Sequence, residues 1–401
     1  MAFGGEHPCN ESGIRRSAIA FGLLTVAIGL LYTLVVGPLV EHSGGWWIVP
    51  DAWLPLRASS FVANGALGYI YQSTPLFENT PLLPILLVPV ALIEQLLRLV
   101  EGFPIPVPHP SAWLVYGPYG FALCTVVFYA ARRLATELGI DRDGLGAQVG
   151  ILVLVVIPAA VVWGHYEDVL ALAFVMLGIR ALLRRRSLSA ALLFGVAILF
   201  KQWALLGVPL LIAASAPDER RRVAAASLLL PGLLVAFPLL VDWPHASVAL
   251  IWARSYPQAG HRALWISSTA RVVAANPERV GAFFVALAVG WWLRGRTEPG
   301  LLLAGFGVVF LARLVFEPVV FAYYLCPALG LLLLHERVAT GGYHRTMLLG
   351  ICLLLFFAIH PPEPIWWAVA VALGAMLCGP AVRDVVSRAG GAVPVEVVPA
   401  S

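Results

Sequence analysis

Long apolar runs, separated by short polar stretches, make up most of this chain. A helix needs about 20 mostly apolar residues to cross a bilayer. The pattern therefore predicts an all-α, polytopic membrane protein. About twelve spans are expected, several of them short, over residues 18–40, 111–131, 146–164, 167–183, 188–201, 203–216, 223–241, 280–293, 299–316, 320–335, 346–360 and 365–379. The first run carries no small-residue cleavage site, so we expect it to be a retained helix.

The run 81–100 is also apolar, but it contains Pro84, Pro89, Glu94 and Arg98. Counting it as a span would place the later arginine clusters on the wrong side of the membrane. We therefore expect an interfacial or re-entrant helix on the outer surface. A plain thirteenth span is the alternative.

Arginine clusters recur between the apolar runs. They lie at residues 15–16, 132–133, 184–186, 220–222, 294–296, 337–345 and 383–388. With twelve spans all of them fall on one side, and the positive-inside rule makes that side cytoplasmic. The chain then forms one domain, 1–401, in the cell membrane. It has a cytoplasmic N-terminus (1–17), outer loops at 41–110 and 242–279, and a cytoplasmic tail (380–401).

Composition agrees with this class. The chain is 60% hydrophobic and only 12% charged, against about 25% charged in soluble domains. The net charge of +4 reflects the arginine clusters and is not a nucleic-acid signal. The five cysteines show no pairing or metal-ligand spacing, so free thiols are expected.

The stretch 163-WGHYEDVLALAF-174 places His165, Glu167 and Asp168 between two apolar runs. On a helix His165 and Asp168 share a face, whereas Glu167 is rotated by about 100°, so the two carboxylates should not face one point. The bland interpretation is a capped, solvated turn. The functional one is a substrate-binding corner at the outer surface. HxxD could be half of a metal site, but no second half is visible.

Asp51 lies early in the first outer loop, close to Trp46, Trp47 and Trp53. A carboxylate among apolar groups at a membrane surface is a candidate general base. The alternative is a helix N-cap. The tryptophans alone are more typical of an interfacial belt than of a sugar platform.

Lys201 is the only lysine in the chain, and the expected topology places it at the outer surface. A lone cation there suits an anion such as phosphate, and a snorkelling lysine is the alternative. The second outer loop adds Arg254, His261, Arg262 and Arg271. These residues could bind a lipid phosphate or lie on an amphipathic surface helix.

The segment 313-RLVFEPVVFAYYLCP-327 carries Glu317 and the Tyr323-Tyr324 pair at the outer ends of later spans. Arg313 precedes Glu317 by four residues, so the two could simply pair with each other.

The early Asp51, the interfacial run, the corner 163-WGHYED-168 and the corner 201-KQW-203 together resemble the GT-C-fold glycosyltransferases. These are multispanning enzymes that use polyprenyl-phosphate sugars. The layout is most similar to the actinobacterial polyprenol-phosphate-mannose-dependent alpha-mannosyltransferases, glycosyltransferase family 87. The resemblance covers most of the chain in layout, through short motifs.

The resemblance implies roles for individual residues. Asp51 would be the catalytic base, with Glu167 and Asp168 orienting acceptor or sugar. It further implies a donor-phosphate group of Lys201, Arg262, His261 and Arg254, and substrate contacts by His165, Tyr69, Trp265 and Glu317. The segment 265-WISSTAR-271 departs in detail from the family's serine-containing stretch, and 71-YQSTPLFENTPLLP-84 replaces a tyrosine-proline donor motif. The donor sugar is therefore open, with mannose the family expectation.

The expected reaction is an inverting single displacement from a polyprenyl-phosphate sugar to a glycolipid or glycan hydroxyl, with no metal or other cofactor required. The main alternative is a transporter or flippase of a lipid-linked sugar. Transporters, however, usually place ionisable groups near the bilayer midplane on broken helices, commonly with internal repeats. A ligase or acyltransferase of another fold, and an inactive scaffold, are further alternatives.

Overall fold

The computed structural model describes residues 11–40, 50–73, 79–100, 109–140, 145–251, 261–262, 276–317, 319–359 and 361–390. Within these ranges the chain is almost wholly helical, as the hydrophobic pattern predicts. The strands found there are β1 (His261–Arg262) and β2 (Val319–Val320), which pair antiparallel.

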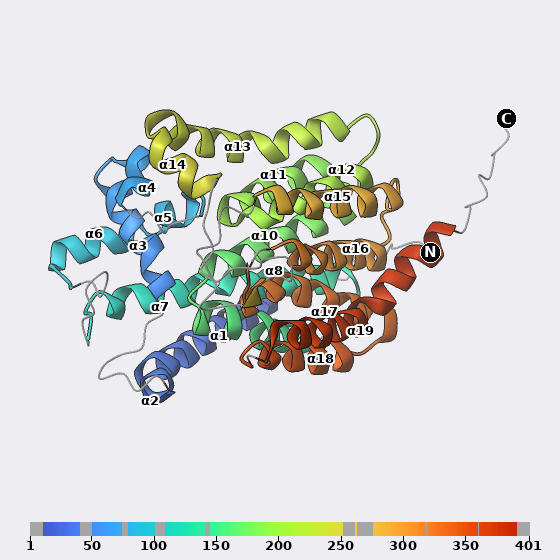
Figure 1. The fold of residues 1–401 in the computed structure, drawn as a ribbon, viewed down its shortest axis with the longest axis horizontal. Coiled ribbons are helices and arrows are strands. Elements are labelled where there is room, and N and C mark those ends of the chain that lie inside the picture. The colour runs from blue at the N-terminus through green and yellow to red at the C-terminus, as the bar shows by residue number, and fades with distance from the viewer. Residues whose placement is uncertain are drawn as a thin grey trace.

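The body of the molecule is a bundle whose longer helices run in roughly one direction (Figure 1). Because α10 is apolar nearly all round, it takes a central place between α8 and α11. The bundle comprises α1 (Glu11–Leu31), η1 (Tyr32–Val36), α2 (Gly37–Val40), α7 (Trp113–Leu123), α8 (Thr125–Glu137), α9 (Leu145–Ile151), η3 (Leu152–Val162), α10 (Tyr166–Leu183), α11 (Ser187–Phe200), η4 (Gln202–Gly207), α12 (Val208–Ala214), α13 (Arg220–Val241), α15 (Asn276–Trp292), α16 (Pro299–Ala312), η5 (Arg313–Phe316), η6 (Ala322–Leu325), α17 (Cys326–Thr340), α18 (His344–Phe356) and α19 (Glu363–Gly390).

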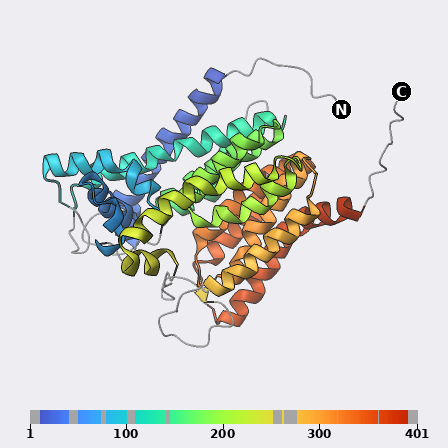
Figure 2. The same ribbon diagram turned by 90° about the horizontal axis from the view of Figure 1, so that it is seen from above.

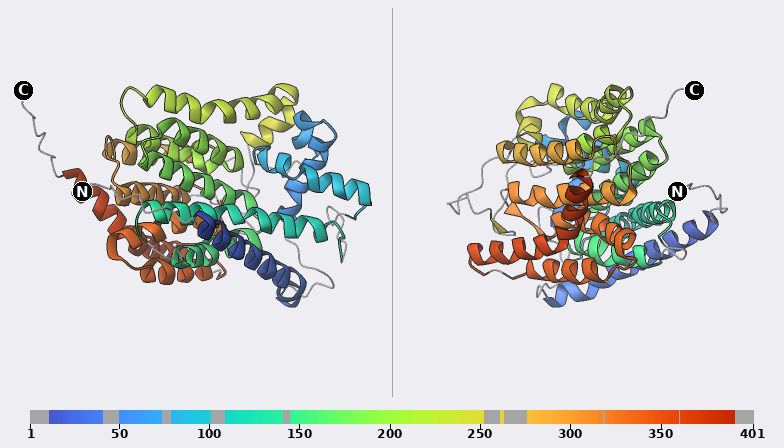
Figure 3. Two further views of the ribbon diagram at one scale, coloured as in Figure 1. Left: turned by 180° about the vertical axis from the view of Figure 1, so that it is seen from behind. Right: turned by 90° about the vertical axis from the view of Figure 1, so that its right-hand side faces the viewer.

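A smaller group of short helices lies at one end of this bundle, and the view from behind in Figure 3 shows it clearly. Leu54, Tyr71 and Ala246 of this group contribute to a small separate core, whereas Leu83 and Val90 belong to the core of the bundle. It contains α3 (Pro50–Ala63), η2 (Leu67–Tyr69), α4 (Ile70–Ser73), α5 (Leu82–Leu86), α6 (Val88–Leu97) and α14 (Trp243–Leu250).

Six stretches in the described ranges are long and apolar enough to cross a membrane: Glu11–Val40, Trp113–Glu137, Leu145–Val162, Arg220–Val241, Pro299–Phe316 and Glu363–Ser387. Apolar side chains such as Leu23, Leu229 and Val371 are exposed on them. Exposed apolar surface of this extent suits lipid rather than water. The count of twelve spans stays a prediction, because several bundle helices are shorter and α10 carries Glu167, Asp168 and Arg180.

The run 81–100 folds as two short helices that meet at Leu87. Ten residues of α helix reach only about 15 Å, half the thickness of a bilayer core. On α6, Leu92, Leu96 and Leu97 are exposed, whereas Val90 and Ala91 are buried. The placement of this run at the membrane surface stays a prediction.

The arginine-bearing ends of the helices meet at the opposite end of the bundle, which we call the arginine end. Arg133 on α8 pairs with Glu11 at the start of α1, and Glu137 pairs with Arg184 at the end of α10. Arg337 on α17 donates to the carbonyl oxygen of Ile140, 2.9 Å away. Figures 1 and 2 show α13 starting and α19 ending on this side.

Candidate functional site

The corner between η3 and α10 is built by local backbone constraints. Pro158 within η3 supplies no backbone N–H. η3 is a π-helix, which is wider than an α-helix. At its end, the amide N–H of His165 donates to the carbonyl oxygen of Ala159, 2.8 Å away. Gly164 then turns the chain with φ +73°, a conformation that favours glycine. A Cβ on Gly164 would lie 2.7 Å from the Cβ of Ala52, so α3 packs directly on the corner.

This packing brings Asp51 to the corner. Asp51 lies in the first turn of α3, where a carboxylate favours the helix N-terminus. Its Oδ2 is also 3.5 Å from Nε2 of His165, and its side chain is 48% exposed. Asp51 can therefore stabilise the start of α3 and belong to the candidate site at the same time.

Glu167 lies deeper in the protein than Asp51, with its side chain only 2% exposed. Its Oε1 is 2.7 Å from Nδ1 of His165 and accepts hydrogen bonds from Lys201 Nζ and Asn79 Nδ2, each at 3.0 Å. These donors hold the buried carboxylate from three separate segments of the chain.

Asp168 is equally buried. Its Oδ1 accepts a 2.6 Å hydrogen bond from Nε1 of Trp203, and its Oδ2 lies 3.3 Å from Lys201 Nζ. The expectation that Glu167 and Asp168 face different points is therefore wrong. Both side chains converge on the Lys201 ammonium, because Lys201 approaches between them from the end of a neighbouring helix.

Lys201 ends α11 in an extended conformation (φ −150°, ψ 129°), which points the chain away from the helix axis. Burial disfavours its charged form, but its contacts with Asp168 and Glu167 offset this cost. Its side chain is 15% exposed. The ammonium thus serves as the counter-ion of the two acids.

His165 is the link between the buried acids and Asp51. Burial lowers its pKa and the Lys201 charge opposes protonation, but the carboxylates of Glu167 and Asp51 prevail and raise the pKa to about 9. At neutral pH the imidazole is therefore protonated. Burial alone would raise the pKa of Asp51, but its contact with the charged His165 lowers it below the usual range. Asp51 is held as a carboxylate facing the solvent.

One wall of the site comes from the segment between α16 and α17. The ring of Tyr323 stacks on His165 with centroids 3.9 Å apart, and Trp163 packs against Tyr323 and Phe321. Arg313 lies over the rings of Trp203 and Tyr324. We call the group of Asp51, His165, Glu167, Asp168, Lys201 and their neighbours Asn79, Trp203, Arg313 and Tyr323 the corner cluster.

The last four of these residues were not assigned site roles from the sequence. Trp203 is part of the KQW corner next to Lys201, but nothing in the sequence indicated that its indole N–H would bind the Asp168 carboxylate. One interpretation of the sequence paired Arg313 with Glu317, but among the described residues its contacts go to Trp203 and Tyr324. Asn79 stands in the stretch 71-YQSTPLFENTPLLP-84, where nothing in the sequence marked it as a partner of Glu167.

The other predicted site residues are not brought into the corner cluster. Tyr69 is half-exposed on η2, beside the end of α13, where Gly68 packs on Val241. Glu317 is buried after η5. His261 and Arg262 form β1, whose backbone pairs with β2 and so lies near the Tyr323 segment, but their side chains lie outside the described residues, as do Arg254 and Trp265.

The corner cluster contains the histidine nitrogen and carboxylate oxygens that commonly bind metal ions. One ligand atom each from His165, Glu167 and Asp168 lies within 4.8 Å of the others, so Glu167 adds a third ligand atom to the HxxD pair, and all three come from the one corner. However, the Lys201 ammonium already contacts both carboxylates. A divalent ion would have to displace this ammonium and the His165 proton. The described cysteines Cys124, Cys326, Cys352 and Cys378 are free thiols, as predicted.

No family model matches the chain, and no curated protein matches it in sequence. Function must therefore be argued from the corner cluster itself. In this cluster the Asp51 carboxylate faces solvent and is kept ionised by the protonated His165. Behind them lies a buried network of Glu167, Asp168 and Lys201. Such a carboxylate can accept a proton from a hydroxyl group.

Proposed function

We propose that this protein is a membrane glycosyltransferase. It moves a sugar, mannose by the family resemblance, from a polyprenyl phosphate to a hydroxyl group of a glycolipid or glycan. The observation that carries the proposal is the position of Asp51. Its half-exposed carboxylate contacts His165 at the rim of a cluster whose other acids are almost fully buried.

In the proposed reaction, Asp51 accepts the proton of the acceptor hydroxyl while that oxygen bonds to the anomeric carbon. The bond from this carbon to the phosphate oxygen breaks, and the lipid phosphate leaves with the electron pair. A phosphate is a good leaving group, so one base and nearby positive charge suffice. Attack from the face opposite the phosphate inverts the anomeric centre.

Glu167, Asp168 and Lys201 support this step as positioning residues. Each is engaged by protein partners, and the carboxylates are 2% and 1% exposed, which suits fixing His165 and Trp203 better than direct proton transfer. A preorganised network of this kind keeps Asp51 in place without reorganisation during the reaction.

The membrane arrangement is part of the proposal. Twelve spans, with the arginine end in the cytoplasm, place the corner cluster at the outer face of the plasma membrane. The contacts that gather Glu11, Arg133, Glu137 and Arg184 at one end of the bundle support this orientation. Outer-face chemistry suits a sugar donor that is carried on a lipid.

The test is transfer from a panel of radiolabelled polyprenyl-phosphate sugars to membrane glycolipids by purified protein in liposomes. Wild type should transfer one sugar, and Asp51→Asn should lose most of that activity. Asp218→Asn, at an exposed aspartate in the turn after α12, is the matched control and should stay active. Movement of a labelled donor across the bilayer without any covalent transfer would refute the proposal in favour of a flippase.

A further inference from the structure

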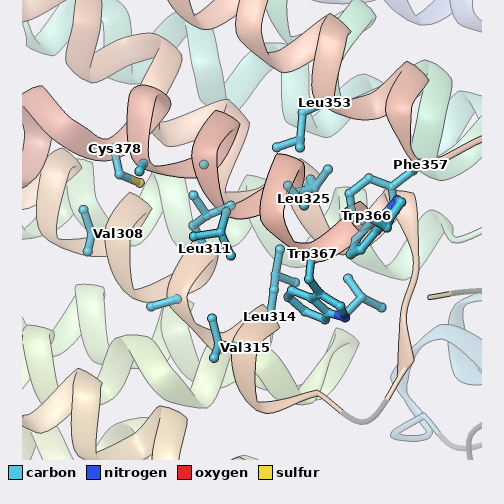
Figure 4. Close-up of a pocket in the computed structure, with 16 residues that line it drawn as sticks. Val308, Leu311, Leu314, Val315, Leu325, Leu353, Phe357, Trp366, Trp367 and Cys378 are labelled. Atoms are coloured by element: carbon cyan, nitrogen blue, oxygen red, sulfur yellow. The ribbon is translucent and has the colours of Figure 1, made fainter. Parts of the chain in front are cut away.

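An apolar cavity of about 250 Å³ lies between α16, α18 and α19. Among the described residues that line it, none carries a charge. Figure 4 shows Val308 and Cys378 towards one end of the cavity and Phe357, Trp366 and Trp367 towards the other. The stretch of α19 from Trp366 to Cys378 is about 18 Å long at the rise of an α-helix, so the cavity is long and narrow.

This cavity is separate from the corner cluster. Leu311 and Val315 line it. Arg313, which lies between them in sequence, instead contacts the ring of Trp203 in the corner cluster. Val315 and Val371 both line the cavity and are 46% and 55% exposed, so the cavity opens on the outside of the bundle. A ligand can therefore enter it from the surroundings of the helices.

The helices at this opening belong to two candidate membrane spans, Pro299–Phe316 and Glu363–Ser387. In a bilayer such helices are surrounded by the acyl chains of lipids. An apolar cavity of about 150 Å³ in a soluble protein excludes water and binds an apolar molecule such as benzene. In a bilayer the available apolar molecule is a lipid chain, and an empty cavity would leave its lining without contacts on one side. A length of about 18 Å is close to one leaflet of the hydrocarbon core, about 15 Å.

The cavity also lies behind one wall of the corner cluster, the segment 320–325. Val320 and Leu325, at the two ends of this segment, line the cavity. Between them, Tyr323 stacks on His165 with ring centroids 3.9 Å apart. η6, within this segment, is a 3₁₀ helix of only four residues. A turn this short has little stability of its own, so its position depends on packing against both of its sides.

We propose that the cavity binds one acyl chain of a membrane phospholipid, and that this chain supports Val320 and Leu325 from behind and so holds Tyr323 against His165. A straight acyl chain is favoured over a branched prenyl chain because the cavity is narrow. The described lining offers no charged group to a phosphate, so the headgroup stays at the membrane surface. The lipid is thus a structural partner of the corner cluster, and this role does not depend on sugar transfer.

The first measurement counts the bound lipid. Full-length protein is released from nanodiscs of palmitoyl-oleoyl phosphatidylcholine and weighed by native mass spectrometry. Wild type should retain a phosphatidylcholine molecule in the cavity after the loosely bound lipids around the helices have been lost.

The second measurement follows hydrogen exchange of the amides of residues 319–326. Among them is the Tyr324 N–H, which donates to the carbonyl oxygen of Phe321 across 3.0 Å. Lipid is removed by transfer into cholate, a rigid steroid detergent that does not fit a narrow cavity, and is then returned as phosphatidylcholine. Removal should speed the exchange of these amides at least about tenfold, because an unfilled cavity makes local opening easier. Return of the lipid should reverse the change.

A pair of glycine variants on α19 shows whether the lipid occupies the cavity. Gly374 lines the cavity, and a Cβ there would lie 3.8 Å from Leu311, an ordinary contact. Gly374→Leu should therefore fill part of the cavity, retain one phosphatidylcholine fewer than wild type, and exchange residues 319–326 more slowly than wild type when lipid is removed. The matched control is Gly379→Leu, where the Cβ enters open space. This variant should behave as wild type.

Equal retention of phosphatidylcholine by wild type and Gly374→Leu would show that the lipid does not occupy the cavity. Exchange of residues 319–326 that does not respond to lipid in wild type would overturn the support of Tyr323. Release of the retained phosphatidylcholine by an equimolar amount of farnesyl phosphate would assign the cavity to a prenyl chain. Each outcome stands whether or not the protein transfers a sugar.

Discussion

Acids pair with cations at both ends of the bundle, but in opposite surroundings. At the arginine end, Glu11 contacts Arg15 and Arg133, and its side chain is 46% exposed. In the corner cluster, Glu167 contacts His165 and Lys201 and is 2% exposed. Exposed pairs contribute about 0–1 kcal/mol, whereas an unpaired buried charge is costly. Loss of an ion pair at the arginine end should therefore lower the free energy of unfolding little, whereas loss of one in the corner cluster should lower it strongly.

The largest expected difference follows from removing one cation at each end. Lys201→Met leaves Glu167 and Asp168 buried without their ammonium, so the free energy of unfolding should fall by about 3–5 kcal/mol. Arg15→Met, at an exposed pair, should change it by less than about 1 kcal/mol. Urea unfolding in detergent measures both. Equal losses would show that the two ends do not differ in the way described.

The second prediction uses pH. Because the pKa of His165 is raised from 6.5 to about 9, its charged form stabilises the fold fully below about pH 6.5, and this contribution is lost as pH rises through 9. The shift corresponds to roughly 3 kcal/mol. The apparent melting temperature of wild type should fall between pH 7 and 10, while His165→Gln should show a flatter profile. Arginine pairs stay charged throughout this range. A fall of the same size in His165→Gln would rule out His165 as its source.

The third comparison uses glycines with positive φ. Gly164→Ala combines backbone strain with a contact on Ala52 that must shift, so it should cost about 2–3 kcal/mol. Gly295, near the arginine end, has a similar φ of +74° and open space where a Cβ would lie. Gly295→Ala should cost only the backbone strain, about 1 kcal/mol. Thermal unfolding of the two variants side by side decides this, and an equal cost would mean that α3 does not press on the corner.

Much of the fold was predictable because helix formation and burial follow from hydrophobic pattern. The apolar runs gave helices, and the run 81–100, which contains Pro84, Glu94 and Arg98, gave two short ones. Helix lengths were less predictable. Residues 188–216 form two helices joined by a 3₁₀ stretch, because the chain changes direction at Lys201.

The site was predictable where several ionisable residues stood close in sequence. His165, Glu167 and Asp168 were identified this way, Lys201 was identified as the only lysine, and Asp51 joins them. The partners Asn79, Trp203 and Arg313 could not be found, because their roles come from contacts between segments that are distant in sequence. The convergence of Glu167 and Asp168 was missed for the same reason, since helical geometry alone separates them and only Lys201 draws them together.

The central claim is that Asp51 does the chemistry while the buried acids hold it in place. The most direct test measures the sugar-transfer rate and the apparent melting temperature of Asp51→Asn in one preparation, with Asp218→Asn as control. Because Asp51 is 48% exposed, its loss should change stability by less than about 1 kcal/mol. The transfer rate should fall by about 10²–10⁴-fold, as for removal of a general base. A transfer rate equal to that of Asp218→Asn would contradict the account.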